Sequence, residues 1–431
     1  MNNNSSEYRR DRRVSWPERS QVEMRFHSLN QLLPQDHRAR TVWAFVQSLD
    51  LAPLYARIEV SPHTSGRSAI APEILVALWL LATLDGIGSA RELGRRCETD
   101  LPYLWICGGV SVNYHTLSDF RVEHADFLES LLIDTVASLV HQGLVPLEVV
   151  AQDGMRVRAN AGSSSFRRRP TLEQLQQEAE AHLKSLQEEG HSEAARQAGE
   201  SRREAAQERA ARERKERMDE ALKQREALSK QREKRQKGTG EESRTSTTDP
   251  DARKMKMANG GYDPAYNVQF NTDGHSRIII GLKVTNEGTD GSQMPGMQQQ
   301  VLERYGRVPG QVLVDSAFTT KESVKLVEKQ GIEVVGGIPR TSQLLKHDHD
   351  PHSPRPGDSE EYKAFRARMA EEKYKALYKQ RPSIAELPNA VCRNRGLRQF
   401  PVRTLVKVKA VILWHALAYN FTRMVKLGVL S

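Results

Sequence analysis

Two acidic residues follow short apolar runs, and their positions give the first indication of chemistry. Residues 147–151 form a run rich in β-branched valine that is closed by Asp153, and residues 311–314 form a second run that ends in Asp315. Such runs favour buried strands. A carboxylate at the end of a buried strand is costly unless it is paired, hydrogen-bonded or bound to a metal. The two carboxylates would meet if their strands were neighbours; otherwise each is a surface residue in a connection between elements.

A third acid stands apart from the others. Glu386 is the only acidic residue between positions 373 and 431, and it follows Tyr378 and Arg381 on a stretch with a helical pattern. Other glutamates after Asp315 have ordinary explanations, because acids at a helix start favour the helix dipole and polar loops give a metal little rigid support. Glu386 is therefore the preferred third acid, either as a metal ligand or as the partner of an arginine.

Three carboxylates can do what isolated ones cannot, which is to hold two Mg²⁺ ions with open positions for phosphate oxygens and water. Carboxylate suits Mg²⁺ because both are hard. Arginine and tyrosine beside the third acid would hold phosphates, arginine through bidentate contacts. Pro382 and Pro388 predict a bent or broken helix around Glu386.

The segments around the first two acids predict a mixed α/β sheet with helices on its faces. Residues 146–161 are interpreted as two strands meeting at Gly154, which permits a tight turn or a close backbone approach, and they are expected in the middle of the sheet. Residues 341–372 are polar and are expected to be irregular. Further strands are expected at residues 266–270, 277–284, 311–314 and 332–338, and helices at 294–305, 320–330 and 402–427.

The first third of the chain has a different character. Residues 1–25 are polar and arginine-rich, which predicts a disordered basic N-terminus. Residues 26–145 show helical periodicity, with Pro72 and Ser89 at expected helix starts. Short helices joined by short turns favour a helix-turn-helix-like DNA-binding domain, although any small helical bundle would show the same pattern.

A charged insertion, residues 167–255, interrupts the sheet domain, which is expected to comprise residues 146–166 and 256–431. The insertion is rich in Glu, Gln, Lys, Arg and Ala, which favour helix, and it lacks the sustained apolar heptads of a coiled coil. We predict a helical hairpin over residues 167–240 with a loose polar return over 238–251. A partly disordered linker is the alternative.

Positive charge is concentrated towards the end of the chain. The 431 residues carry a formal charge of +9, and residues 361–431 contain 15 lysines and arginines against four acids. Such an excess indicates a polyanionic partner, most simply nucleic acid. The alternative is a solvated basic face without a ligand.

The cysteines and the apolar segments bear on the compartment. Cys97, Cys107 and Cys392 are scattered without metal spacing, so free thiols in a reducing compartment are expected. The N-terminus lacks the apolar core of a signal peptide, and the most apolar segment, residues 410–422, is too short to cross a bilayer. We expect a cytoplasmic, nucleoid-associated protein with no membrane partner.

Taken together, the motifs resemble a known family, the bacterial insertion-sequence transposases of the DDE type, which have an RNase H-like catalytic domain. The resemblance rests on QDGMRVRANA around Asp153, AYNVQF at 265–270, VLVDSAF around Asp315, and the last block of the chain. That block resembles the family's Tyr-Arg-Glu-Lys signature. Glu386 comes one residue later than the signature has it, and Arg393 replaces the lysine.

The resemblance implies a function and a site. It implies that Asp153, Asp315 and Glu386 form the catalytic triad and bind two Mg²⁺ or Mn²⁺ ions per active site. It also implies cleavage at the ends of a mobile element and transfer of the 3′-hydroxyls to target DNA within a homo-oligomeric complex. The DNA contacts are expected from Tyr378, Arg381, Arg393, Arg395 and Arg398.

Three alternatives remain open from the sequence. A metal-dependent nuclease of the same fold would cut DNA without joining it, and an inactive relic of a mobile element would only bind DNA. Asp290 is a possible further ligand, but we interpret it as a helix N-cap near Met294.

Overall fold

The computed structural model describes Ser20 and residues 26–59, 68–189 and 198–430. Apart from Ser20, the N-terminal segment predicted to be disordered lies outside the described residues. Among those residues, no helix is both long enough and apolar enough to span a membrane. All three cysteines are free, as predicted, and the structure shows that they are buried.

The centre of the molecule is a mixed six-stranded sheet, as the alternation of strands and helices predicts. Its strand order is β4-β5-β1-β7-β8, and β6 pairs with the part of β5 that β4 leaves open. β1 is antiparallel to β5 and parallel to β7, so it occupies the predicted central position. The strands are β1 (Val149–Arg158), β4 (Arg253–Lys256), β5 (Tyr262–Asp273), β6 (Ile279–Thr285), β7 (Gln311–Val314) and β8 (Glu333–Gly336).

β1 is one continuous strand, so the prediction of two strands meeting at Gly154 was wrong. Asp153 lies in the middle of β1, opposite Phe270 of β5, and does not close the strand. The physical reason is the partner: the 12-residue strand β5 pairs with β1 from Val150 to Arg158 and keeps the backbone extended past the glycine. Gly154 instead permits a close approach, because the side chains of Gln269 and Asp290 lie directly against it.

Helices pack on the sheet, and some of them lie in the segment that was predicted to be irregular. The prediction of irregular structure over residues 341–372 was wrong in part, because Ser359 caps a helix whose Tyr362 and Phe365 are buried. This helix and its neighbours pack beside β8. The helices on this side of the chain are α12 (Gln293–Tyr305), α13 (Lys321–Glu328), α14 (Thr341–Lys346), α15 (Glu360–Arg368), α16 (Glu372–Tyr378), α17 (Arg381–Asn394) and α18 (Leu405–Lys426).

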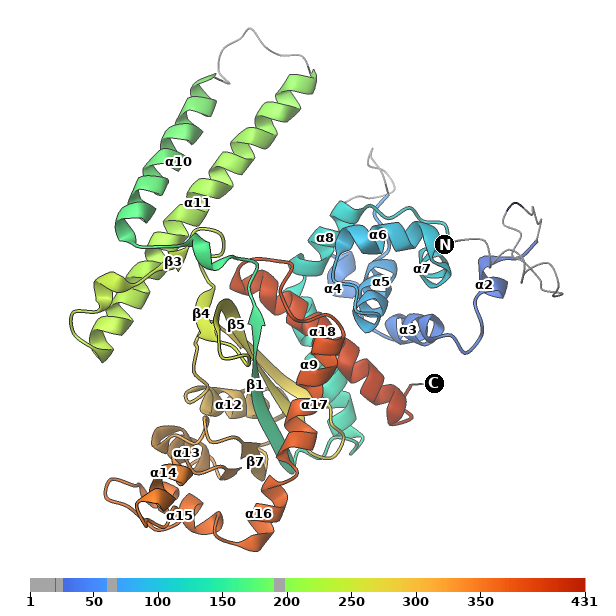
Figure 1. Ribbon diagram of the computed structural model, residues 1–431. Coiled ribbons are helices and arrows are strands. Elements are labelled where there is room, and N and C mark those ends of the chain that lie inside the picture. Colours follow the sequence, from blue (N-terminus) through green and yellow to red (C-terminus); the bar gives the residue numbers. More distant parts are fainter. Residues whose placement is uncertain (1–19, 21–25, 60–67, 190–197, 431) are drawn as a thin grey trace, which may run out of the picture.

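The N-terminal helices pack against the half that contains the sheet, through α18 (Figure 1). Trp79 of α5 and Trp414 of α18 are both buried at this junction, and one apolar core continues from the helical bundle into the sheet. The predicted helix starts at Pro72 and Ser89 are present. The helices are α2 (Leu29–Leu32), α3 (Arg38–Gln47), α4 (Ala52–Tyr55), α5 (Pro72–Leu84), α6 (Ala90–Thr99), α7 (Leu101–Cys107), α8 (Tyr114–Glu123) and α9 (Ala125–His141).

The charged insertion forms a helical hairpin that projects from the sheet (Figure 1). Its arms are α10 (Arg169–Glu189) and α11 (Ala198–Arg235), and Gln176 donates to Asp219 across them at 2.5 Å. At its root, β2 (Phe166–Arg167) pairs with β3 (Thr245–Ser246).

The prediction of a loose return after the hairpin was wrong. Ser243, Thr245, Ser246 and Asp249 are buried, because this segment fills the space between α11 and the edge of the sheet. The return therefore fixes the root of the hairpin to the sheet.

Candidate active site

Sheet register brings the first two acids together. β1 and β7 run parallel, with Val149 opposite Gln311 and Ala151 opposite Leu313. Continuing this register by two residues places Asp153 level with Asp315, which directly follows β7. Neighbouring strands lie about 4.8 Å apart, so the register brings the two acids to adjacent strand positions, and the charge of Asp315 acts on Asp153. The backbone N–H of Ala317 donates to Asp315 Oδ1 at 2.7 Å and orients that carboxylate.

Asp153 is poised between its charged and neutral forms. Burial raises the pKa of its carboxyl to about 6, while the positive charge of Arg381 and the N–H of Gly154 lower the pKa. The nearby carboxylates of Asp315 and Glu386 act in the same direction as burial, and the value of about 6 includes all of these effects. The side chain Nδ2 of Asn389 donates to Asp153 Oδ2 at 2.8 Å. Three acids and one arginine therefore act on a single electrostatic site.

The third acid reaches this site from α17, which packs on β1 and β5. The Glu386 side chain is 57% exposed, and its Oε1 accepts a hydrogen bond from Arg381 Nη2 at 3.1 Å. In the part of the chain that the structure describes, no three acidic, histidine or cysteine side chains converge closely enough to hold a metal. Asp153 and Asp315 are thus adjacent, and Glu386 lies nearby with its carboxylate paired to Arg381.

The available donors nevertheless fit a hard divalent cation. All three carboxylates are oxygen donors, and Asn389 adds a buried amide oxygen, Oδ1, that has no hydrogen-bond partner. Oxygen donors of this kind suit Mg²⁺ and Mn²⁺. Asn389 was missed by sequence reasoning. Its only signal was its position three residues after Glu386, which places both side chains on one face of α17.

Tyr378 and Arg381 of the signature lie on either side of the break between α16 and α17. Tyr378 ends α16, and its hydroxyl approaches Gly337 beside Ser316, the residue after Asp315. Arg381 begins α17 and is 13% exposed, so it faces the acids more than solvent. The predicted helix break is present before Pro382. No break occurs at Pro388, which lies inside α17.

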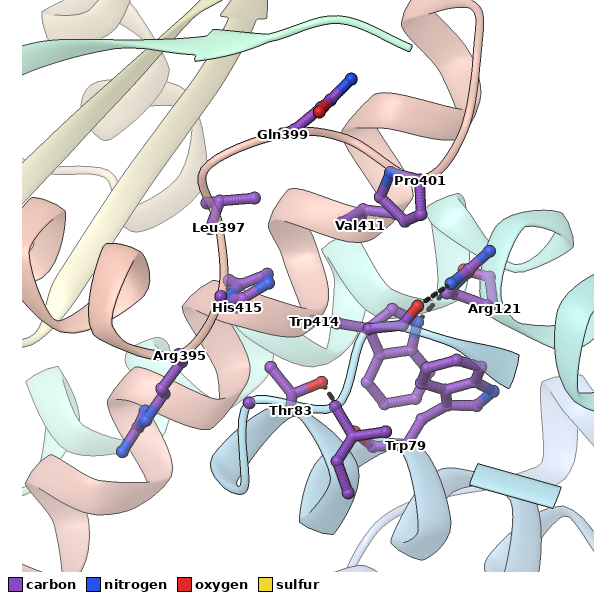
Figure 2. A pocket seen from close by; sticks show the side chains of 14 residues that line it. Trp79, Thr83, Arg121, Arg395, Leu397, Gln399, Pro401, Val411, Trp414 and His415 are labelled. Atoms are coloured by element: carbon purple, nitrogen blue, oxygen red, sulfur yellow. Dashed lines mark hydrogen bonds between the residues drawn. The ribbon is translucent and has the colours of Figure 1, made fainter. Parts of the chain in front are cut away.

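The predicted DNA-binding arginines after Glu386 do not share one environment. Arg393 and Arg398 are exposed. Arg395 is half-buried, donates to Thr422 at 2.7 Å, and has a pKa lowered by burial. Figure 2 shows Arg395 with His415 and Trp79 around a cavity of about 100 Å³ between α5 and α18. Arg395 therefore supports the junction of the two halves, and its side chain is less accessible than those of Arg393 and Arg398.

Part of the C-terminal positive charge is also used internally. A basic residue that pairs with a carboxylate or carbonyl of its own chain contributes little to an external field. The basic residues of positions 361–431 therefore do not all contribute to one positively charged surface. Arg366 pairs with Asp358, Arg368 with Glu328 and Lys409 with Glu129, and Arg423 donates to the carbonyl of Ser276.

A buried polar network supports β1 from the face opposite Asp153. Asp290 accepts hydrogen bonds from Arg156 at 2.7 Å, Asn267 at 2.7 Å and Gln269 at 2.8 Å. The interpretation of Asp290 as the N-cap of α12 was wrong, because Ser292 occupies that position. The Asp290 carboxylate is bound by side chains of β1 and β5. The alternating sequence pattern showed these positions to be polar but did not show their partner.

Comparison with known families agrees with this architecture. A transposase domain family (DUF772) matches residues 27–123, and a transposase DDE domain family matches residues 236–421. No curated protein and no solved structure was found to match the chain. The fold and the two matches define a DNA transposase, a nucleotidyl-transfer enzyme. The chain belongs to the insertion-sequence transposases of the DDE type, and its sheet domain is RNase H-like.

The DDE match begins after the hairpin, so β1 and Asp153 precede it. The assignment of Asp153 to the site therefore depends on the sheet register and the shared electrostatics described above.

Proposed function

We propose that this transposase cleaves DNA at the ends of its insertion sequence and joins the freed 3′-hydroxyls to target DNA, with Asp153, Asp315 and Glu386 as the catalytic acids. In the first step a water oxygen attacks the phosphorus, and the bond to the 3′ oxygen of the element breaks. In the second step that 3′-hydroxyl attacks a target phosphodiester. One new P–O bond forms, and one 3′-hydroxyl of the target is released.

The single observation that carries this proposal is the alignment of Asp153 with Asp315 on parallel neighbouring strands, within electrostatic reach of Glu386. DDE transposases in general use divalent metal ions. Two Mg²⁺ or Mn²⁺ ions held by these acids and Asn389 Oδ1 would activate the attacking oxygen and stabilise the leaving oxygen. Glu386 would have to turn from Arg381 to join them, which leaves the guanidinium free to hold a phosphate.

The other residues of the site have positioning roles in this proposal. Asn389 holds one oxygen of Asp153 in place, and the Asx turn after β7 holds Asp315. Tyr378, Arg381, Arg393 and Arg398 would contact phosphates, and the enzyme would act as a homo-oligomer on both ends of the element.

We expect cleavage to require a divalent cation. DNA from both flanks of the reading frame, carrying the inverted repeats, should be nicked in Mg²⁺ or Mn²⁺ and left intact in excess chelator. Products in which an element end is joined through its 3′-hydroxyl to a second plasmid distinguish a transposase from a nuclease that only cuts. Robust cleavage in excess chelator would overturn the proposed chemistry.

A second expected result concerns pH. Because folding raises the pKa of Asp153 from 3.8 to about 6, the folded chain holds this proton more tightly than the unfolded chain does. In cation-free protein, the free energy of unfolding therefore falls as pH rises from about 4 to 6. A cation must displace the same proton, so Mn²⁺ affinity should fall about tenfold per pH unit below pH 6 and level off above it.

Titration calorimetry with Mn²⁺ in buffers of different ionisation enthalpy measures both the affinity and the proton released. Asp153→Asn should remove the proton release along with most of the affinity. An affinity that is flat from pH 5 to 8 would show that Asp153 is not a ligand.

A further inference from the structure

We propose that a basic groove at the root of the α10–α11 hairpin binds the sugar-phosphate backbone of the DNA on which the active site acts. This inference rests on the proposed function, since it takes DNA as the substrate. The hairpin-root groove lies between α11, β2 and the edge strand β4 and has a volume of about 990 Å³. Figure 1 shows α11 passing β3 and β4 at this place. The basic residues of its lining are Arg168, Arg232, Arg244, Arg253, Lys254 and Lys256.

Charge in this groove is strongly one-signed. Only two carboxylates, Glu242 and Glu287, line it, and Glu242 is paired with Arg232 at 3.7 Å. The side chains of Arg168, Arg244 and Lys256 are exposed, and none of them has an ion-pair partner among the described residues. Cations without carboxylate partners that face one concave surface are the pattern expected of a phosphate-binding track.

The groove also offers contacts that a merely solvated basic face would lack. Tyr262, at the start of β5, is 65% exposed and can stack on a base or sugar. Ser243 lines the groove, and its Oγ is buried without a hydrogen-bond partner. Lys254 lies 5.3 Å from the centre of the Phe166 ring, which keeps its ammonium in place over the groove wall. Stacking, a hydroxyl donor and fixed cations together suit a nucleic-acid backbone better than an acidic peptide.

Buried contacts hold the groove walls together. Arg225 of α11 is 2% exposed and donates to Glu241 at 2.8 Å. Arg253 of β4 donates to Gln224 of α11 at 2.5 Å and to the carbonyl of Pro250 at 2.7 Å. The cations are therefore presented by a braced surface joining the hairpin to the sheet, so less ordering entropy opposes binding.

The groove adjoins a second hollow that reaches the loop after β7. Gly288 and Thr289 line both it and a second hollow of about 730 Å³. The second hollow extends past Arg156 to Ala317, two residues after Asp315. Together the two hollows run from the hairpin root to the loop after β7, along the face of the sheet that carries Arg156 and Asp290. The one-signed charge of the groove and the membership of the chain in the transposases are the reasons that DNA is chosen as the occupant.

The test is a salt titration of DNA affinity on the full chain. In the triple variant Arg168→Gln, Arg244→Gln and Lys256→Gln, the affinity for duplex DNA from the element's end should fall at least tenfold at 0.1 M salt. Each lost phosphate contact removes about 0.9 from the log–log salt slope, so the slope should become less steep by two to three. Fluorescence anisotropy measures both quantities, and an unchanged melting temperature shows that the exposed substitutions leave the fold intact.

The matched control removes the same charge from the same insertion. Arg203, Arg209 and Arg214 are exposed on α11 away from its root, and changing all three to Gln should leave affinity within about twofold. Equal losses in the two triple variants would show a general charge effect and overturn the groove. Unchanged DNA binding in the groove variant would overturn the proposal as well. Polyglutamate serves as a probe for an acidic peptide, and a groove variant that loses affinity for polyglutamate but not for DNA would also overturn it.

The groove and the proposed function can fail separately. If the wild-type enzyme cleaves and joins element ends while the groove variant binds DNA normally, the groove is wrong and the transposition chemistry stands. If the groove variant loses DNA affinity but the wild-type enzyme cleaves nothing in Mg²⁺ or Mn²⁺, the binding surface stands and the proposed catalytic function fails.

Discussion

Replacing Glu386 by glutamine is expected to lower the rate of DNA strand cleavage about a thousandfold, while folding and end-binding stay largely intact. A metal-bound transition state gains several kcal/mol from its ions, and about 4 kcal/mol corresponds to a factor of a thousand. The substitution removes one negative ligand with almost no change in volume. Single-turnover cleavage of an end-containing duplex measures the rate, and anisotropy measures the binding.

The structure sharpens this experiment because Glu386 already has a partner. If its role were only the ion pair with Arg381, the loss would be that of an exposed pair, about 1 kcal/mol or less, and cleavage would fall less than about tenfold. Glu372→Gln is the matched control, since Glu372 is exposed and, among the described residues, its ion pair is with Lys375. Asp153→Asn and Asp315→Asn should match Glu386→Gln. Near-normal cleavage by Glu386→Gln would place the third ligand elsewhere.

The second large effect is expected at Gly154, where a single methyl group should disrupt both stability and catalysis. A Cβ at this position would lie 2.3 Å from Gln269 Nε2 and 2.8 Å from Asp290 Oδ1. These side chains are buried and bonded to each other, so they have little freedom to move aside. Gly154→Ala should cost about 1–3 kcal/mol of unfolding free energy, as overpacked cores do.

The same displacement would reach the adjacent Asp153. Shifting a catalytic group by about 1 Å can lower the rate about a hundredfold, so cleavage should fall by that factor even below the melting temperature. Gly296→Ala is the control, because nothing lies within 4 Å of its added Cβ on α12, and alanine should stabilise the helix by about 0.5–1 kcal/mol. Wild-type melting and cleavage in Gly154→Ala would contradict the close approach seen in the structure.

Local pattern determined much of this protein. The β-branched run before Asp315 predicts β7 with its observed bounds, Gln311–Val314, because strand propensity and burial act over a few residues. Pro72 and Ser89 mark helix starts for similarly local reasons. The composition of the insertion favoured a helical hairpin but left a partly disordered linker as the alternative, whereas the motifs were sufficient to indicate the family.

Tertiary structure decided which of those residues share a site. The pairing of Asp153 with Asp315 depends on the register between β1 and β7, and no short window of sequence contains both strands. Asn389 joins the acids only because α17 packs across β1. Arg395 carries the same charge as Arg393, yet the packing of α5 against α18 buries one and leaves the other exposed. Sequence specifies residue types and local elements, whereas burial and partners depend on contacts between segments far apart in the chain, and these contacts set the charge and reach of each candidate residue.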